Sequence, residues 1–285
     1  MNALLFDIGG TNMRLAVTRD GRRFGSPIIT KSPKEYRAAI ATITLLARQL
    51  TGSARITAAT GGVPGALSPN KDRLLSSTHL PRWAGKPLVR DLATHLKTTV
   101  RLENDADLAG LGEAHYGAGR GYSILAYLTI STGVGGTRIV GGRIDRAAIG
   151  LEPGHQIIKF DGPTYPPYHN PYLRGTLEAL ISGTAIQHRY HRPPRQIRSV
   201  TVWKEAAKRL AVGLVNVAYF WSPEAVVLGG SMMKKPGIDV NEVRTQLRHL
   251  LSSYRMPKLA RAQLGDVGGL YGALELLKQN KRRAD

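Results

Sequence analysis

Short apolar runs alternate with longer amphipathic stretches along the whole chain. Residues 3–6 and 15–17 are apolar runs of the length of buried strands, and a glycine-rich turn lies between them. Residues 36–50 then repeat apolar side chains at helical spacing, which predicts a helix that Gly52 ends. Just before it, residues 32–35 have the pattern of a capping box with proline in the first turn. Alternating strand and helix patterns of this kind predict an α/β fold.

The alternation continues to the far end of the chain. In the first half we expect a strand at 55–59, a glycine-rich turn at 61–65, a helix at 86–97, and a strand at 99–102 that leads into another helix. In the second half we expect a strand from residue 123, a return strand at 138–140, a hairpin turn at 141–142, helices from Thr176 and at 201–221, a strand at 225–228 and a helix at 268–277.

The layout of strand, glycine turn and strand occurs twice. In the first copy, residues 9–11 form a turn whose backbone N–H groups can face a phosphate, and Asp7 beside it is placed to hold a divalent cation through water. The second copy contains Thr132 and Gly133, and two such turns could bind a triphosphate from both sides of a cleft. Hairpin geometry alone is the alternative for each copy. A third glycine pair, residues 229–230, follows a buried strand and could admit a purine ring to the backbone or form a simple turn.

Several polar residues near strand ends or in loops are candidates for a functional site, but each also has a purely structural explanation. Asn104 and Asp105 lie where a strand meets a helix start, a position that an N-cap also fills. Glu178, early in a helix, would complement the helix dipole. Glu152 and His155 share one loop, which in isolation is typical of a protein surface.

Composition narrows the classes of protein. The 285 residues include 40 Lys and Arg against 20 Asp and Glu, a net charge of +20, which would attract polyanions such as RNA or polyphosphate, or would serve only solubility. The basic segment 188–198 interleaves aromatic residues with its cations, as RNA-binding segments do, but its two prolines also suit a solvated loop.

The absence of cysteine excludes disulfides, thiolate metal sites and cysteine nucleophiles. With no signal-like segment or long apolar run, we expect a cytoplasmic protein that does not associate with membranes.

Taken together in this order, the motifs resemble the ROK family of sugar kinases and sugar-responsive repressors, within the actin/hexokinase/Hsp70 superfamily. The resemblance implies an α/β fold of two RNase H-like (actin-like ATPase) domains with a cleft between them. The N-terminal domain would span residues 1–118, completed by the helix at 268–285, and the C-terminal domain residues 119–267. The most specific stretches are residues 103–113, 128–136, 152–155 and 177–186.

The resemblance also implies a function: an ATP-dependent hexose kinase, acting on glucose at its 6-hydroxyl, with Mg²⁺ as cofactor and a homodimeric assembly. Asp105 would be the catalytic base, and Asp7 would orient the Mg²⁺ ion. The implied phosphate and adenine contacts are Gly9, Gly10, Thr11, Asn12, Thr132, Gly133, Gly229 and Gly230. The implied sugar contacts are Gly65, Asn104, Asp105, Glu152, His155 and Glu178.

Three departures from the family pattern modify these expectations. Zinc-binding members use a histidine equivalent to His155 together with three cysteines, so we expect no zinc, and the aromatic loop 163–172 would hold His155 by packing. His79 stands where the family has asparagine, which leaves one sugar contact open. The first strand begins at Ala3 without the repressors' DNA-binding domain, so we do not expect a repressor. The alternatives are polyphosphate as the phosphoryl donor, or a non-catalytic sugar-sensing or RNA-binding protein of the same fold.

Overall fold

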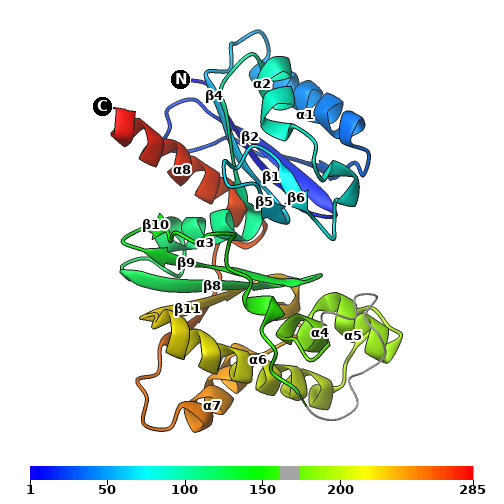
Figure 1. Cartoon of the computed structure of the whole chain (residues 1–285), viewed down its shortest axis with the longest axis vertical. Helices are drawn as coiled ribbons and strands as arrows, with labels where there is room; N and C mark the ends of the chain where they lie inside the picture. The colour runs from blue at the N-terminus through cyan, green and yellow to red at the C-terminus, as the bar shows by residue number, and fades with distance from the viewer. Residues whose placement is uncertain (161–173, 285) are drawn as a thin grey trace. The chain divides into compact units, whose positions relative to one another are not determined.

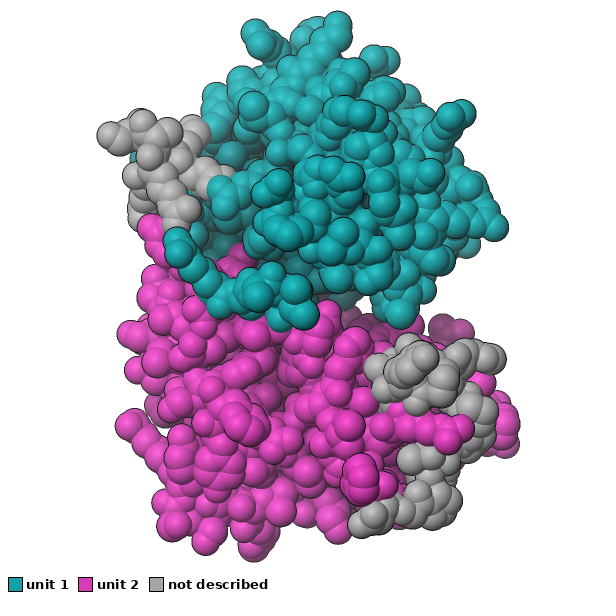
Figure 2. All heavy atoms as spheres, in the orientation of Figure 1, with its two compact units in different colours: residues 1–116, 146–150, 266–285 teal, residues 117–145, 151–265 magenta. Residues whose placement is uncertain are grey.

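The chain forms two compact units in this computed structural model, which describes residues 1–160 and 174–284. Unit 1 comprises residues 1–116, 146–150 and 266–285, and unit 2 comprises residues 117–145 and 151–265 (Figure 2). The aromatic loop expected to hold His155 lies outside the described residues. Among the described residues, no helix combines the length and the apolar composition needed to cross a bilayer.

Unit 1 is built on a five-stranded sheet whose parallel strands carry the candidate residues. The strand order is β3 (Ile28–Lys31), β2 (Asn12–Thr18), β1 (Ala3–Ile8), β4 (Ala58–Val63) and β7 (Val100–Asn104). The β1–β2–β3 part is antiparallel, whereas β1, β4 and β7 run parallel. The carboxyl ends of these three parallel strands therefore meet at one edge of the sheet, where α/β proteins place their ligand-binding residues.

Four helices cover the two faces of this sheet. Helices α1 (Tyr36–Thr51) and α2 (Leu88–Leu96) lie on one side, and α3 (Asp105–Tyr116) and α8 (Gly268–Ala284) lie together on the other (Figure 1). Successive residues of β1 point to opposite faces, so its fully buried Leu4, Phe6 and Ile8 join the α1 and α2 core. The short elements of the unit are β5 (Ala66–Leu67), β6 (Leu74–Ser76) and the 3₁₀ turns η1 (Pro81–Trp83) and η6 (Gly265–Val267).

Unit 2 repeats the same sheet. Its strand order is β10 (Arg143–Ile144), β9 (Val134–Val140), β8 (Ile124–Ile130), β11 (Ala225–Gly229) and β12 (Lys258–Arg261). The first three strands are antiparallel and the last three parallel, as in unit 1. The predicted hairpin turn is confirmed, since Gly141 and Gly142 both have positive φ between β9 and β10. The two halves of the sequence thus fold to one topology.

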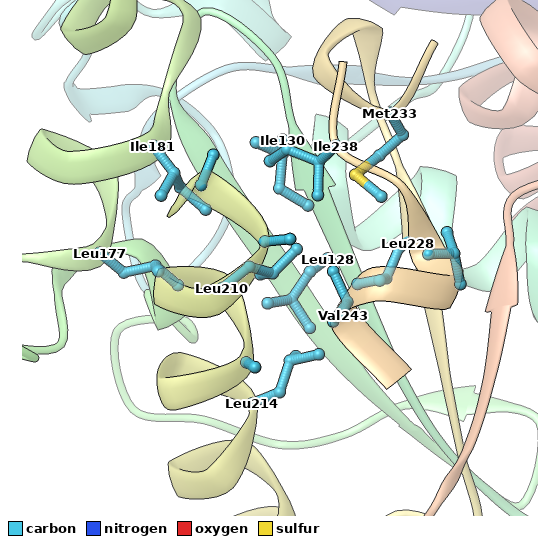
Figure 3. Close-up of a cluster of buried hydrophobic side chains, with 14 of the residues drawn as sticks. Leu128, Ile130, Leu177, Ile181, Leu210, Leu214, Leu228, Met233, Ile238 and Val243 are labelled. Carbon is cyan, nitrogen blue, oxygen red and sulfur yellow. The ribbon is translucent and has the colours of Figure 1, made fainter. Parts of the chain in front are cut away.

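Helices of unit 2 pack on its sheet around a continuous apolar core. Figure 3 shows Leu210 and Leu214 of α6 (Val200–Trp221) facing Leu128 of β8, with Val243 of α7 (Val240–Leu251) beside them. The prediction of a long helix at 201–221 is confirmed, whereas α7 and β12 were not predicted. The remaining elements are α4 (Leu177–Ile181), α5 (Gly183–Tyr190), η2 (Pro153–His155), η4 (Pro194–Gln196) and η5 (Ser231–Met233).

The predicted capping box at residues 32–35 is wrong. Helix α1 begins at Tyr36, and Glu35 at its N-cap makes no side-chain capping bond. Ser32 is instead buried, and its hydroxyl donates a hydrogen bond to the carbonyl of Gly9, at 2.7 Å. The serine therefore stabilises the glycine turn after β1 instead of a helix start.

The glycine-rich turn predicted at residues 61–65 is also wrong in its first part. Gly61 and Gly62 lie inside β4, in register with β1 and β7. A Cβ atom on Gly61 would collide with the ring and carbonyl of Phe6, and one on Gly62 would lie 3.1 Å from Cα of Asp105. Close packing explains these glycines. Strand β9 similarly begins at Val134, earlier than the expected 138–140.

Candidate active site

The turn between β1 and β2, residues 9–12, presents free backbone amides. The amide of Gly9 donates to the carbonyl of Asn12 at 2.9 Å, which closes the turn. In the described part of the chain, the amides of Gly10 and Thr11 have no hydrogen-bond partner. Gly10 also packs on His79, whose Cβ would lie 2.7 Å from a Cβ added to Gly10. Two adjacent free N–H groups on such a turn suit an anion such as phosphate.

Asp7 is held at the N-terminus of α8. Its carboxylate lies on Gly269, where an added Cβ would be 2.5 Å from Cγ of Asp7. Arg14, its cross-strand partner on β2, places one guanidinium nitrogen 4.0 Å from Asp7 and another 4.0 Å from Asp266. Burial raises the pKa of Asp7 to about 6, Arg14 opposes this shift and Asp266 adds to it.

The surroundings of Asp7 fit a hydrated magnesium ion. Mg²⁺ takes oxygen ligands, keeps several waters, and is usually held by one or two carboxylates together with substrate phosphates. Asp7 offers such a carboxylate beside the free amides of residues 10–11, and a nearby divalent charge would favour its ionised form. Among the described residues no cluster of three or more His, Asp or Glu could enclose a metal ion by itself.

Asn104 and Asp105 lie at the junction of β7 and α3. The Asn104 side-chain oxygen accepts from the amides of Ala106 and Asp107, at 2.8 and 3.2 Å, so the N-cap alternative holds for this residue. Its amide nitrogen donates to the carbonyl of Gly65 at 3.1 Å. The structure thus brings Gly65, another predicted sugar contact, next to this junction.

Asp105 is the most strongly perturbed carboxyl group of unit 1 at this edge. Its Oδ1 accepts a hydrogen bond of 2.9 Å from the amide of Ala106. Burial raises the pKa of Asp105 to about 7, and the charges of Asp7 and Asp107 add to the shift. A carboxyl group with a pKa near neutrality can accept a proton more readily than an ordinary aspartate.

The turn between β8 and β9, residues 131–133, repeats these features in unit 2. The amides of Thr132 and Gly133 have no hydrogen-bond partner among the residues that the structure describes. The next amide, of Val134, donates to Oε2 of Glu178 at 2.7 Å, and an added Cβ on Gly133 would lie 2.6 Å from the same oxygen. The predicted phosphate turn and the predicted sugar contact Glu178 are therefore in direct contact.

Glu152 directly precedes η2 and His155 is its last residue, and η2 packs on β9. A Cβ on Gly154 would collide with the carbonyl of Val134, so this short helix lies directly against the start of β9. Desolvation raises the pKa of Glu152, His155 opposes the shift and Glu178 adds to it. Glu152, His155 and Glu178 thus interact electrostatically in unit 2.

The glycine pair at the end of β11 lies beside the second turn. Gly230 has φ of +93°, and a Cβ there would collide with the carbonyl of Ile130. The hydroxyl groups of Ser131 and Ser231 are 3.1 Å apart. Gly229 and Gly230 therefore belong to the same end of the sheet as Thr132 and Gly133.

The predicted residues fall into two clusters, one in each unit. Unit 1 gathers Asp7, Gly9, Gly10, Thr11, Asn12, Gly65, Asn104 and Asp105, and unit 2 gathers Thr132, Gly133, Glu152, His155, Glu178, Gly229 and Gly230. Sequence reasoning missed Arg14, whose place opposite Asp7 follows from the hairpin register. It also missed Lys34, whose ammonium group donates to the carbonyl of Gly10 at 2.5 Å, because no local pattern links residues 24 positions apart.

Solved structures of known proteins share this architecture. A ROK hexokinase from Thermus thermophilus matches with a TM-score of 0.82 and 29% sequence identity, over 99% of this chain and 100% of the other. A ROK family glucokinase from Streptomyces griseus, solved with glucose and AMPPNP, matches with a TM-score of 0.81 over 98% and 100%, and its 24% identity bears on the fold alone. The expected fold class, α/β with two RNase H-like domains of the actin-like ATPase type, is confirmed.

Sequence comparison covers the same extent of the chain. The model of the ROK family matches residues 4–280. N-acetyl-D-glucosamine kinase from Citrobacter koseri is 31% identical over 293 aligned positions, which cover 94% of this chain and 96% of the relative. Together with the two copies of the strand, turn and strand layout, these matches show that the chain belongs to the ROK family.

Proposed function

We propose that the protein is a hexose kinase that transfers the γ-phosphoryl group of ATP to the 6-hydroxyl of a sugar. The observation that carries the proposal is Asp105, whose pKa of about 7 suits a base, in the same cluster as the free amides of Gly10 and Thr11. The names of the relatives support a sugar kinase: one is an N-acetyl-D-glucosamine kinase and one is a hexokinase.

Asp105 acts on the sugar hydroxyl. It aligns the hydroxyl oxygen with the γ-phosphorus and accepts the proton as the new P–O bond forms, because a free hydroxyl group is a poor nucleophile. The amides of residues 10–11 and 132–133 bind phosphate oxygens and stabilise the charge that develops on them. Magnesium, held through Asp7 and water, supplies further charge neutralisation when bound.

The sugar is held by side chains that offer both donors and acceptors. The groups we propose for binding of its hydroxyl groups are Asn104 and the backbone at Gly65 in unit 1, and Glu152, His155 and Glu178 in unit 2. Glucose is the substrate we propose first. N-acetylglucosamine is the second candidate, because the relative of 31% identity is named an N-acetyl-D-glucosamine kinase.

We also propose that the protein is a homodimer, and light scattering would measure its mass in solution.

A product screen tests the proposal. The protein is incubated with Mg-ATP or with Mg-polyphosphate and, in turn, glucose, N-acetylglucosamine, mannose and fructose, and the products are identified by mass. We expect a sugar 6-phosphate with ATP, with glucose or N-acetylglucosamine as the preferred acceptor. Turnover with polyphosphate only would exclude ATP as the donor. Phosphorylation of no hexose, combined with salt-sensitive binding of RNA, would refute the kinase proposal and favour the RNA-binding alternative.

A paired variant identifies the base. Asp105→Asn should remove turnover while calorimetry still detects sugar binding, because asparagine keeps the shape and the Oδ1 acceptor but cannot take up the proton. Glu205→Gln, the same chemical change on the exposed surface of α6, is the matched control and should keep full activity. Near-normal turnover by Asp105→Asn would exclude the role of this residue.

A further inference from the structure

The first three carbonyl groups of the first turn, those of residues 9–11, are bound from one segment. The backbone amide of Ser32 donates to Thr11 at 2.9 Å, and its hydroxyl donates to Gly9 at 2.7 Å. The ammonium group of Lys34 donates to Gly10 at 2.5 Å. Three consecutive carbonyls, of residues 9–11, are therefore occupied by residues 32–34.

These bonds fix the direction of the free amides. In a trans peptide the C=O of one residue and the N–H of the next lie in one plane and point in opposite directions. The Gly9 carbonyl shares its peptide with the Gly10 amide, and the Gly10 carbonyl shares its peptide with the Thr11 amide. By binding the two carbonyls, Ser32 and Lys34 hold the two N–H groups pointing away from residues 32–34.

The second turn is held in the same way by different residues. The carbonyl of Ser131 accepts from the amide of Gly183 at 2.7 Å. The carbonyl of Thr132 accepts from the amide and the hydroxyl of Thr184, at 3.3 and 2.9 Å. These two carbonyls share their peptides with the amides of Thr132 and Gly133, which are the free amides of this turn. Both turns thus have two peptides bound on the C=O side and free on the N–H side.

Lys34 makes a second contact besides the one with the turn. Its ammonium group also donates to the carbonyl of His79 at 3.0 Å, so it links the turn to the segment before η1. The side chain is exposed, and its charge lies at the turn itself. A cation held there raises the positive potential at the turn in addition to orienting the amide of Thr11.

We propose that Ser32, Lys34 and Thr184 are positioning residues that keep the two turns in their phosphate-binding orientation, and that Lys34 also contributes its charge to binding of the phosphoryl donor. The inference rests on the proposed function, since it concerns the nucleotide side of the same reaction. It assigns no contact with the sugar to these three residues.

The test compares nucleotide and sugar parameters in matched variants. Ser32→Ala, Lys34→Met and Thr184→Val each remove a side-chain contact with a turn carbonyl, and Lys34→Met also removes the contact with the carbonyl of His79. Lys34→Arg and Thr184→Ser keep a donor. Lys31→Met removes a neighbouring exposed charge. Thr42→Val removes a hydroxyl whose hydrogen bond, among the described residues, is to the carbonyl of Ala38 within α1, so these two variants are the controls. For each variant we would measure KM for ATP and for the sugar, and the Kd of Mg-AMPPNP by calorimetry.

We expect the KM for ATP and the nucleotide Kd to rise about tenfold in the three deletion variants. The sugar KM should stay within about twofold, and Thr184→Ser and Lys34→Arg should recover most of the nucleotide affinity. Nucleotide affinities equal to those of the controls would overturn the proposal. So would an equal rise in both KM values, or a fall in melting temperature alone, because each indicates a general structural role.

The same measurements separate this proposal from the proposed function. A wild-type protein that phosphorylates no sugar but binds Mg-AMPPNP refutes the kinase, and the Kd values of the variants still decide the role of the three residues. A wild-type protein that binds no nucleotide refutes both. Active enzyme with unchanged nucleotide Kd in all three variants refutes only the positioning role.

Discussion

Replacing Asp105 by asparagine should make the ligand-free protein more stable as well as inactive. The pKa of this carboxyl group rises from 3.8 to about 7 because burial and the charge of Asp7 disfavour its ionised form. One pKa unit corresponds to about 1.4 kcal/mol, so a shift of about 3 units lowers the free energy of unfolding by about 4 kcal/mol once the group is ionised. Since Asp105 is partly exposed, we expect Asp105→Asn to recover about 2 to 4 kcal/mol at about pH 8.

The raised pKa of Asp105 also sets the pH range in which Asp105→Asn is more stable than wild type. An acid whose pKa is raised in the folded state destabilises the fold fully above the folded pKa, here about 7, and not at all below the unfolded value of 3.8. The difference between the variant and wild type should therefore be complete at about pH 8. At about pH 4.5 it should fall to about a quarter of that value.

Urea unfolding followed by far-UV circular dichroism, without sugar or nucleotide, measures the difference at both pH values. Glu205→Gln is again the control and should change the free energy of unfolding by less than about 0.5 kcal/mol. An Asp105→Asn protein that is no more stable than wild type at about pH 8 would refute the reasoning, because the carboxylate would then not be disfavoured by its surroundings.

Three further predictions follow from individual contacts. Gly61→Ala should lower the free energy of unfolding by about 3 kcal/mol, because the new methyl group collides with Phe6. Gly25→Ala, where no atom lies within 4 Å of the added Cβ, is the control, and equal unfolding midpoints for the two variants would contradict the packing argument. Glu178→Ala should raise the KM for ATP as well as the KM for the sugar by about tenfold, because the Glu178 carboxylate binds the amide that follows the second turn. Two-substrate kinetics would measure both values, and a rise in the sugar KM alone would exclude a role of Glu178 at the phosphate turn. The kcat/KM for the sugar should fall about tenfold for each pH unit below about 7 as Asp105 becomes protonated, so a profile that is flat from about pH 8 to 5.5 would exclude this base.

The sequence predicted most of the fold because strand and helix periods are local. The helix expected at 201–221, the buried strand at 225–228 and the hairpin turn at 141–142 all have counterparts in the structure. The errors arose where tertiary contacts override a local signal. Ser32 looks like a helix cap but binds the carbonyl of Gly9, and Gly61 looks like a turn residue but lies in a strand against Phe6.

The residues of the candidate site could be predicted from the sequence to different extents. Residues at strand ends, such as Asp7 and Asp105, could be found from their position because parallel strands bring their carboxyl ends together. Lys34 and Thr184 could not, because each reaches its turn from a segment distant in sequence, over 24 and 52 residues. No local period or motif encodes such contacts.

The close crossing of α3 and α8 has a consequence for biosynthesis. Gly112 and Gly272 allow the two backbones to touch, since a Cβ on either glycine would collide with a main-chain carbonyl of the other helix. All of unit 2 lies between these helices in the sequence. A ribosome therefore completes unit 2 before α8 has joined α3 on its side of the first sheet, so unit 2 can fold first and unit 1 becomes complete only after α8 has left the exit tunnel.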